Sequence, residues 1–182
     1  MVFDIYTLVE AIWFVLPAYA ANGLTPILGL RKGLHPIDGG MIYRGQPLFG
    51  EGKSWEGLFF GALIGGLIGL VEMLAFPYLP FNVSPVALNI IAMTPLLGVL
   101  LGLGAMVGDL GGSFVKRRLR IARGKPAPFL DQLDFLTGAL IFSLILLSLE
   151  IEWLILLAFI TFILHIVANI IAYLLNIKKQ PW

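Results

Sequence analysis

The chain has 182 residues, of which 59% are hydrophobic and 13% are charged, with a net charge of +1 and no cysteine. A soluble domain carries about 25% charged residues, so this composition cannot cover a globular surface and indicates a membrane protein. The small net charge gives no field that would attract nucleic acid, and the lack of cysteine excludes disulfides and cysteine-based zinc sites.

Five apolar segments are long enough to be considered as membrane spans, since a helix needs about 20 residues to cross the hydrocarbon core. They cover residues 3–24, 58–76, 86–107, 133–149 and 153–176. The first segment has no basic residues before it and no small-residue cleavage site, which is typical of a retained span rather than a signal peptide. We therefore predict an all-α polytopic membrane protein, with five transmembrane helices in a single integral-membrane domain over residues 1–182.

The basic residues indicate the orientation of these spans. Every Lys and Arg lies in residues 31–53, 116–125 or 178–179, and five spans place all three regions on one side. The opposite side carries Asp4, Glu150 and Glu152. By the positive-inside rule, we predict an outer N-terminus, a cytoplasmic C-terminus and two long cytoplasmic loops.

Small and acidic residues mark the second and first predicted spans. Gly61, Gly65 and Gly69 recur at four-residue spacing, which favours close helix packing in lipid. Glu10 and Glu72 are ionisable residues within spans and are therefore candidates for function. They support an alternative hypothesis, a small membrane transporter or channel, although the chain has no detectable inverted repeat of the kind many transporters have.

The first cytoplasmic loop contains a glycine-rich stretch at residues 49–55. It is not a P-loop, because the pattern requires glycine where this chain has Pro47. A flexible loop that brings Lys53 and Ser54 to a phosphate remains a hypothesis. Recognition of the substrate through three other residues of this loop, Asp38, Gly39 and Arg44, is a second hypothesis.

The second cytoplasmic loop gathers cations and carboxylates. Ser113, Lys116 and Arg117 share one face if this stretch is helical, and Ser113 is predicted to cap a helix N-terminus, where phosphates bind well. Asp131 and Asp134 also share a face. A plain cationic anchor for lipid phosphates is the alternative, but acids would weaken such an anchor.

The carboxylates predict a metal site. Asp109, at the end of the third span, lies on the same membrane side as Asp131 and Asp134. Hard oxygen ligands without histidine or cysteine favour Mg²⁺. His165 and Asn169, at i and i+4 in the fifth span, are assigned either to helix packing or to substrate contact.

The stretch 108–118, followed by Asp131 and Asp134, resembles the signature of CTP-dependent phosphatidate cytidylyltransferases. The shortened linker at residues 123–126 is similar to that of the archaeal branch, the CDP-archaeol synthase family. The stretch 49–57, the pair His165 and Asn169, and the ending at 179–182 are also similar to that branch. Asp38-Gly39-Gly40 does not extend into the longer aspartate repeat of CDP-alcohol phosphotransferases.

This resemblance implies a multi-pass enzyme of the cell membrane, with its active site on the cytoplasmic side. The implied substrates are CTP and 2,3-bis-O-geranylgeranylglycerol 1-phosphate, an ether lipid phosphate, and the products are CDP-archaeol and pyrophosphate. The expected catalytic residues are Asp109, Lys116, Asp131 and Asp134, with the three aspartates as Mg²⁺ ligands. The residues expected to bind phosphates are Lys53, Ser54, Ser113, Lys116 and Arg117.

Overall fold

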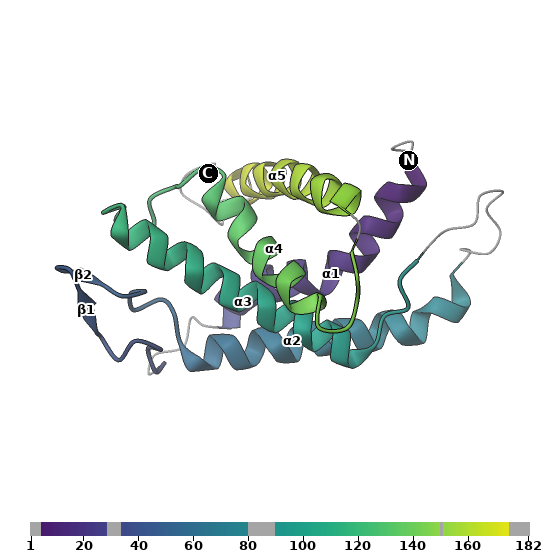
Figure 1. Cartoon of the computed structure of the whole chain (residues 1–182), viewed down its shortest axis with the longest axis horizontal. Helices are drawn as coiled ribbons and strands as arrows, with labels where there is room; N and C mark the ends of the chain where they lie inside the picture. Colours follow the sequence, from purple (N-terminus) through teal and green to yellow (C-terminus); the bar gives the residue numbers. More distant parts are fainter. Residues whose placement is uncertain (1–4, 29–33, 80–89, 150, 175–182) are drawn as a thin grey trace.

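A computed structural model describes residues 5–28, 34–79, 90–149 and 151–174. The elements in chain order are α1 (Ile5–Leu28), β1 (Ile42–Tyr43), β2 (Gln46–Pro47), α2 (Trp55–Ala75), the 3₁₀ turn η1 (Phe76–Tyr78), α3 (Pro95–Arg118), α4 (Leu130–Ser143) and α5 (Ile151–Leu174). Figure 1 shows β1 and β2 beside the first turns of α2 and the last turns of α3. The all-helical architecture predicted from the sequence is confirmed.

Four of the helices are long and apolar enough to cross a membrane: Tyr6–Pro26, Trp55–Tyr78, Pro95–Arg118 and Trp153–Ile171. The remaining predicted span, 133–149, is helical only as far as Ser143. The 14 residues of α4 rise about 21 Å at 1.5 Å per residue, which is less than the hydrocarbon thickness. Five crossings therefore stay a prediction. Asp4, Glu150, Arg31, Lys32, Lys178 and Lys179, which contribute to the predicted orientation, lie outside the described residues.

Glycine contacts bring α2 and α3 together at close range. A Cβ on Gly65 would lie 2.3 Å from the carbonyl oxygen of Gly98, and one on Gly102 would lie 2.3 Å from that of Gly61. No side chain fits at such distances, so the two backbones touch directly. The predicted glycine stripe is confirmed as a helix-packing surface.

Close backbone contact at glycines also joins α3 to α4. A Cβ on Gly104 would lie 2.5 Å from the Gly138 carbonyl oxygen, and one on Gly108 would lie 2.1 Å from the Asp134 carbonyl oxygen. The helix α3 thus has a glycine face towards each neighbour and becomes the central helix of the molecule. This contact fixes the depth at which Asp134 sits beside the last turns of α3.

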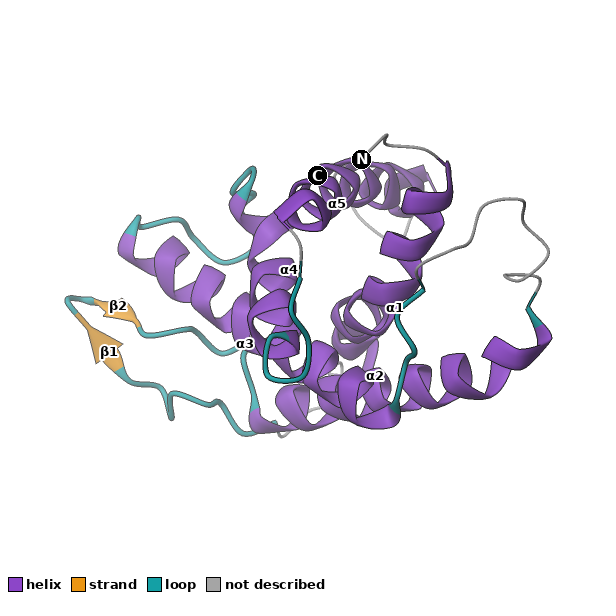
Figure 2. Ribbon diagram, turned by 45° about the vertical axis from the view of Figure 1, so that its right-hand side comes forward, coloured by secondary structure: helices purple, strands orange, loops and turns teal. Residues whose placement is uncertain are grey.

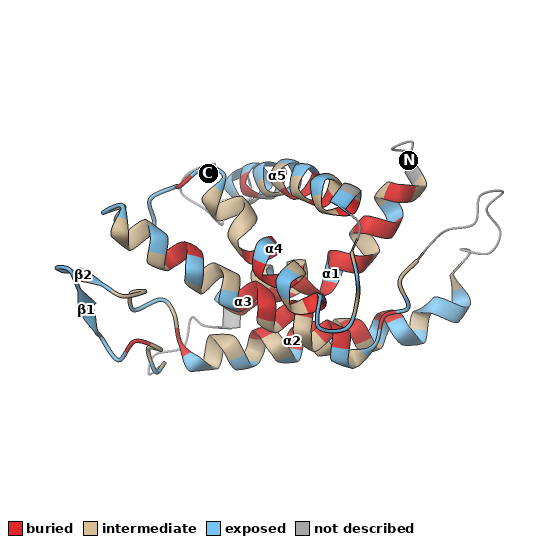
Figure 3. Cartoon of the chain, viewed as in Figure 1, coloured by how far each residue is buried: buried red, intermediate tan, exposed pale blue. Residues whose placement is uncertain are grey.

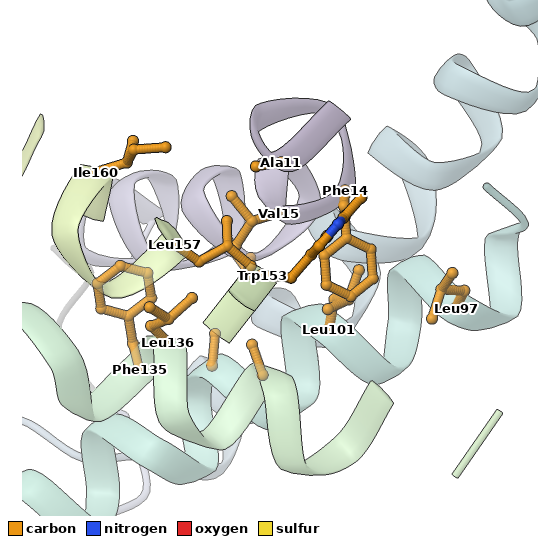
Figure 4. Close-up of a cluster of buried hydrophobic side chains, with 14 of the residues drawn as sticks. Ala11, Phe14, Val15, Leu97, Leu101, Phe135, Leu136, Trp153, Leu157 and Ile160 are labelled. Atoms are coloured by element: carbon orange, nitrogen blue, oxygen red, sulfur yellow. The ribbon is translucent and has the colours of Figure 1, made fainter. Parts of the chain in front are cut away.

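The apolar core lies between α1, α3, α4 and α5 (Figures 3 and 4). Phe14 on α1 packs edge-on against Trp153 on α5, with ring centroids 5.9 Å apart. Leu101, Leu136 and Leu157 are fully or almost fully buried around them. This core holds the helices whose ends carry the charged residues described next.

Candidate active site

A polar cavity of about 610 Å³ lies where the end of α3 and the start of α4 meet the loop 34–54. Its volume lies within the range of small-molecule sites, about 300–1,000 Å³. Figure 2 shows the β1–β2 hairpin and the loops that border this end of the molecule. The charged and hydroxyl residues that line the cavity are Asp38, Glu51, Lys53, Asp109, Ser113, Lys116, Arg117, Arg123, Asp131 and Asp134.

The last turns of α3 supply one wall of the cavity. Asp109, Ser113, Lys116 and Arg117 lie on one face of a continuous helix that runs to Arg118, well beyond the predicted end at residue 107. The prediction that Ser113 caps a helix N-terminus is wrong, because Ser113 lies inside α3 and is buried. Three basic residues in the final turn favour this extension through the helix dipole.

The first turns of α4 supply the facing wall. Lys116 Nζ donates to Asp131 Oδ1 at 2.8 Å, which ties the two helices together. The other carboxylate oxygen of Asp131 accepts a hydrogen bond from the backbone N–H of Ala127 at 2.8 Å. Asp131 therefore holds the turn that leads into α4 as well as its lysine partner.

The glycine-rich loop supplies a third wall. Lys53 donates to Asp109 across the cavity. Gly50 takes a φ of +98°, a conformation that favours glycine. Ser54 does not line this cavity, and its hydroxyl caps α2 by accepting from Gly57 N at 3.1 Å. Phosphate binding by Ser54 stays a prediction, because Ser54 is not among the residues that line the cavity.

Asp38 organises the backbone of this loop. Its carboxylate accepts hydrogen bonds from the N–H groups of Gly40, Phe49 and Gly50 at 3.0, 2.9 and 3.0 Å. Burial acts to raise the pKa of Asp38, but these backbone donors outweigh it and hold the pKa below its ordinary value. Asp38 is thus kept ionised and positions the loop rather than offering free oxygens.

Arg118, Arg123 and Glu51 were not singled out by the sequence analysis, and Arg118 has the clearest structural role. Its guanidinium donates to the carbonyl oxygens of Tyr43 and Pro47, both at 2.6 Å, and so fastens the hairpin to α3. Arg123 and Glu51 line the cavity and lie 3.5 Å apart. In the sequence these residues are members of charged loops, and no spacing rule separates them from their neighbours.

The carboxylates that line the cavity offer oxygen atoms, which are the ligands that a hard divalent cation prefers. Asp109 and Asp131 are each paired with a lysine, whereas Asp134 forms no salt bridge among the described residues. Within that part of the chain, no three acidic or histidine side chains are already arranged to coordinate an ion. Oxygen donors from Asp109, Asp131 and Asp134 line one cavity, which fits Mg²⁺ once the lysines release their partners.

The remaining candidates lie away from the cavity. Glu10, Glu72, His165 and Asn169 do not line it. Glu72 stands 18 residues after Ser54, about 27 Å along α2 from the end that borders the cavity. The transporter hypothesis would need ionisable residues along a path, and most of the described charged residues instead lie in or near the loops at the cavity end, with Glu10 and Glu72 as exceptions.

Comparisons with known proteins agree with these observations. A family model described as CarS-like, CDP-archaeol synthase, matches residues 3–182. A CDP-archaeol synthase from Methanocaldococcus jannaschii is 42% identical over 96% of this chain and 97% of its own length. One from Pyrococcus abyssi is 41% identical, over 95% of this chain and 97% of its own.

A solved structure is also similar. It is described as an intramembrane enzyme for archaeal membrane lipid biosynthesis, with a TM-score of 0.71 and 39% sequence identity. The match covers 89% of this chain and 94% of the solved chain.

Proposed function

The chain belongs to the CDP-archaeol synthase family, and we propose that its polar cavity is where a cytidylyl group passes from CTP to an ether lipid phosphate. It is accordingly a nucleotidyltransferase that uses CTP and forms CDP-archaeol in archaeal membrane lipid biosynthesis. One observation supports this cavity as the site of the reaction: Lys53, Lys116 and Asp134, which belong to three separate segments of the chain, line it together. This membership also removes the transporter alternative.

The reaction joins an oxygen of the lipid phosphate to the α-phosphorus of CTP, and the bond from that phosphorus to the departing pyrophosphate breaks. The lipid here is 2,3-bis-O-geranylgeranylglycerol 1-phosphate. Its phosphate has a second pKa of about 6, so the nucleophile is anionic at neutral pH and needs no general base. This agrees with a cavity lined by carboxylates and cations and without a lining histidine among the described residues.

The cations of the cavity would bind the triphosphate. Lys53, Lys116 and Arg117 approach from two walls, and Ser113 offers a hydroxyl between them. Positioning and charge neutralisation supply most of the rate in phosphoryl chemistry, so these residues act by holding the α-phosphorus in line with the attacking oxygen. Arg123, at the rim, is a further phosphate contact.

Asp109, Asp131 and Asp134 would hold Mg²⁺, which neutralises charge on the triphosphate and on the leaving pyrophosphate. A triphosphate would compete with Asp109 and Asp131 for Lys53 and Lys116, and would thereby leave these two carboxylates available as ligands of the ion. Lysine exchange therefore couples nucleotide binding to metal binding in this proposal.

The cavity would face the cytoplasm, where CTP is available. The basic residues of the described loops, such as Lys53 and Arg123, border the cavity, which supports the predicted cytoplasmic side through the positive-inside rule. A lipid phosphate at headgroup depth reaches the same place while its chains stay in the membrane.

Pyrophosphate release by the detergent-purified protein tests this function. We expect release with CTP, Mg²⁺ and the geranylgeranyl ether lipid phosphate together, and none when the lipid is left out. Parallel reactions with ATP and with phosphatidic acid measure the selectivity for nucleotide and lipid. Pyrophosphate release that does not depend on the lipid would refute the proposed transfer.

A further inference from the structure

An apolar groove runs between α3 and α4 and meets the polar cavity at Asp134. Its volume is about 760 Å³, and Asp134 lines both spaces. The apolar side chains along it include Val107, Val115, Leu119, Phe129, Leu133 and Ile141. The groove is therefore an open, mostly apolar depression that shares one carboxylate, Asp134, with the proposed active site.

The floor of the groove is made of glycines on α3, and they differ in what surrounds them. A Cβ on Gly112 would lie 1.9 Å from Asp134 Oδ2, and one on Gly108 would meet the backbone of Asp134, so helix packing requires both glycines. Gly111 has nothing within 4 Å of an added Cβ. A glycine in a helix interior costs roughly 0.5–1 kcal/mol relative to alanine, and packing does not explain it at Gly111.

The mouth of the groove carries a strained aromatic residue. Phe129, immediately before α4, has a φ of +66°, in the left-handed region that side chains such as phenylalanine rarely adopt. The residue is 66% exposed, and its ring stacks on Phe162 of α5, with centroids 5.2 Å apart and planes 13° from parallel. Backbone strain of this kind clusters at ligand sites, and here it fixes an exposed ring at the groove.

We propose that this groove holds a hydrocarbon chain of the lipid phosphate, so that the phosphate is delivered beside Asp134. The inference rests on the proposed function and adds where the lipid lies. A chain of the lipid fits because Asp134 and Thr137 are the polar side chains along the groove among the described residues, which leaves a peptide few hydrogen-bond partners. It also fits because the groove joins the site where the headgroup reacts.

The groove would orient the lipid through its shape, and not through a gain in free energy when the hydrocarbon chain moves from the bilayer into the groove. A chain that leaves lipid for the groove gains little, since lipid is as apolar as the groove walls. A chain held in the groove instead fixes the headgroup in one register, and the phosphate oxygen reaches CTP in one orientation. Gly111 is then a specificity residue, because any side chain there would occupy the space of the hydrocarbon.

Replacement of Gly111 tests the proposal. Gly111→Leu meets no protein atom at its Cβ and gains helix propensity, so the variant keeps its fold and unfolding temperature. We expect the KM for the geranylgeranyl lipid phosphate to rise roughly tenfold or more, on the scale of steric exclusion from a pocket. The KM for CTP should stay unchanged, and a lipid phosphate with short chains should react as with the wild type.

Gly23→Leu is the matched control, because Gly23 is also exposed in a helix, has nothing within 4 Å of an added Cβ and lines neither space. It should leave both KM values unchanged. A Gly111→Leu protein with the wild-type KM for the long-chain lipid would overturn the groove while the proposed function stands. Absence of lipid-dependent turnover in the wild type would overturn the function and the groove together.

Discussion

At the scale of single residues, two lysine–aspartate pairs determine the charge that the cavity presents to a nucleotide. Lys116 and Asp131 lie 2.8 Å apart, and Lys53 pairs with Asp109. Both lysines are largely shielded from water, with side chains 13% and 23% exposed for Lys116 and Lys53. A triphosphate has more charge than a carboxylate, so we expect it to displace the aspartates from both lysines.

Lys53→Gln should weaken CTP binding. The change removes a charge-assisted hydrogen bond worth about 1.5–3 kcal/mol, which is roughly 10–150-fold in the KM for CTP. The KM for the lipid should change far less. Lys125→Gln is the matched control, because Lys125 is exposed in the neighbouring loop and does not line the cavity. Equal KM values for CTP in both variants would contradict the assignment of Lys53 to the CTP-binding site.

The sequence predicts most of these cavity residues and misses others for a physical reason. Lys53, Asp109, Lys116, Asp131 and Asp134 stand out because charge is rare in an apolar chain and these positions are grouped. Ser54 is equally polar, and its hydroxyl caps α2, a role that the grouping of charges does not indicate. Its contact with phosphate stays a prediction. The role of Arg118 depends on a hairpin about 70 residues earlier, and only the folded chain brings the two together.

At the scale of helices, backbone contacts between α2 and α3 hold the molecule together. Gly65 and Gly98 approach so closely that their carbonyl oxygens occupy the places of side chains. Because the atoms in contact belong to the two backbones, a change of side-chain rotamer cannot relieve a clash here. Relief requires a shift of one whole helix relative to the other. The position of Asp109 and Lys116 relative to Lys53 depends on this contact.

Gly65→Ala should therefore destabilise the fold. Its Cβ would lie 2.3 Å from the Gly98 oxygen and 2.8 Å from the Gly102 Cα, and forcing helices apart costs about 1–3 kcal/mol. We expect a lower unfolding temperature in detergent. Gly23→Ala, a helical position with open space, should keep the unfolding temperature or raise it slightly. A Gly65→Ala protein as stable as the wild type would contradict the close packing.

The helices themselves were predicted better than their ends. The lengths of the apolar segments predicted α1, α2 and α5, and they predicted the apolar part of α3. It could not show that α3 continues to Arg118, because that extension is polar and is supported by contacts with α4 and the hairpin. It also could not show that α4 ends at Ser143, since residues 144–149 are as apolar as the helix before them.

At the scale of the whole molecule, the charge distribution predicts that the cavity lies on the cytoplasmic side of the membrane. The chain has no cysteine, so single cysteines can report on accessibility without further changes. Arg120→Cys should react with an impermeant thiol reagent only from the cytoplasmic side. Tyr78→Cys, 87% exposed beyond the far end of α2, should react only from outside.

Labelling of Lys178→Cys separates five crossings from four. If residues 133–149 cross the membrane, this position is cytoplasmic and reacts from the same side as Arg120→Cys. Reaction from outside would mean that α4 returns to its own side and that the chain crosses four times. The measurement bears on the short α4, which carries both Asp131 and Asp134.

The most direct test of the cavity as the site of cytidylyl transfer compares the wild type with Asp134→Asn, using CTP labelled at its α-phosphate. The wild type should transfer the label to the lipid and lose this activity when a chelator removes Mg²⁺. Asp134→Asn keeps the shape of the side chain and removes its charge, which should cost several kcal/mol of transition-state stabilisation, or at least about a hundredfold in rate. A folded Asp134→Asn protein with near wild-type label transfer at saturating Mg²⁺ would contradict the account.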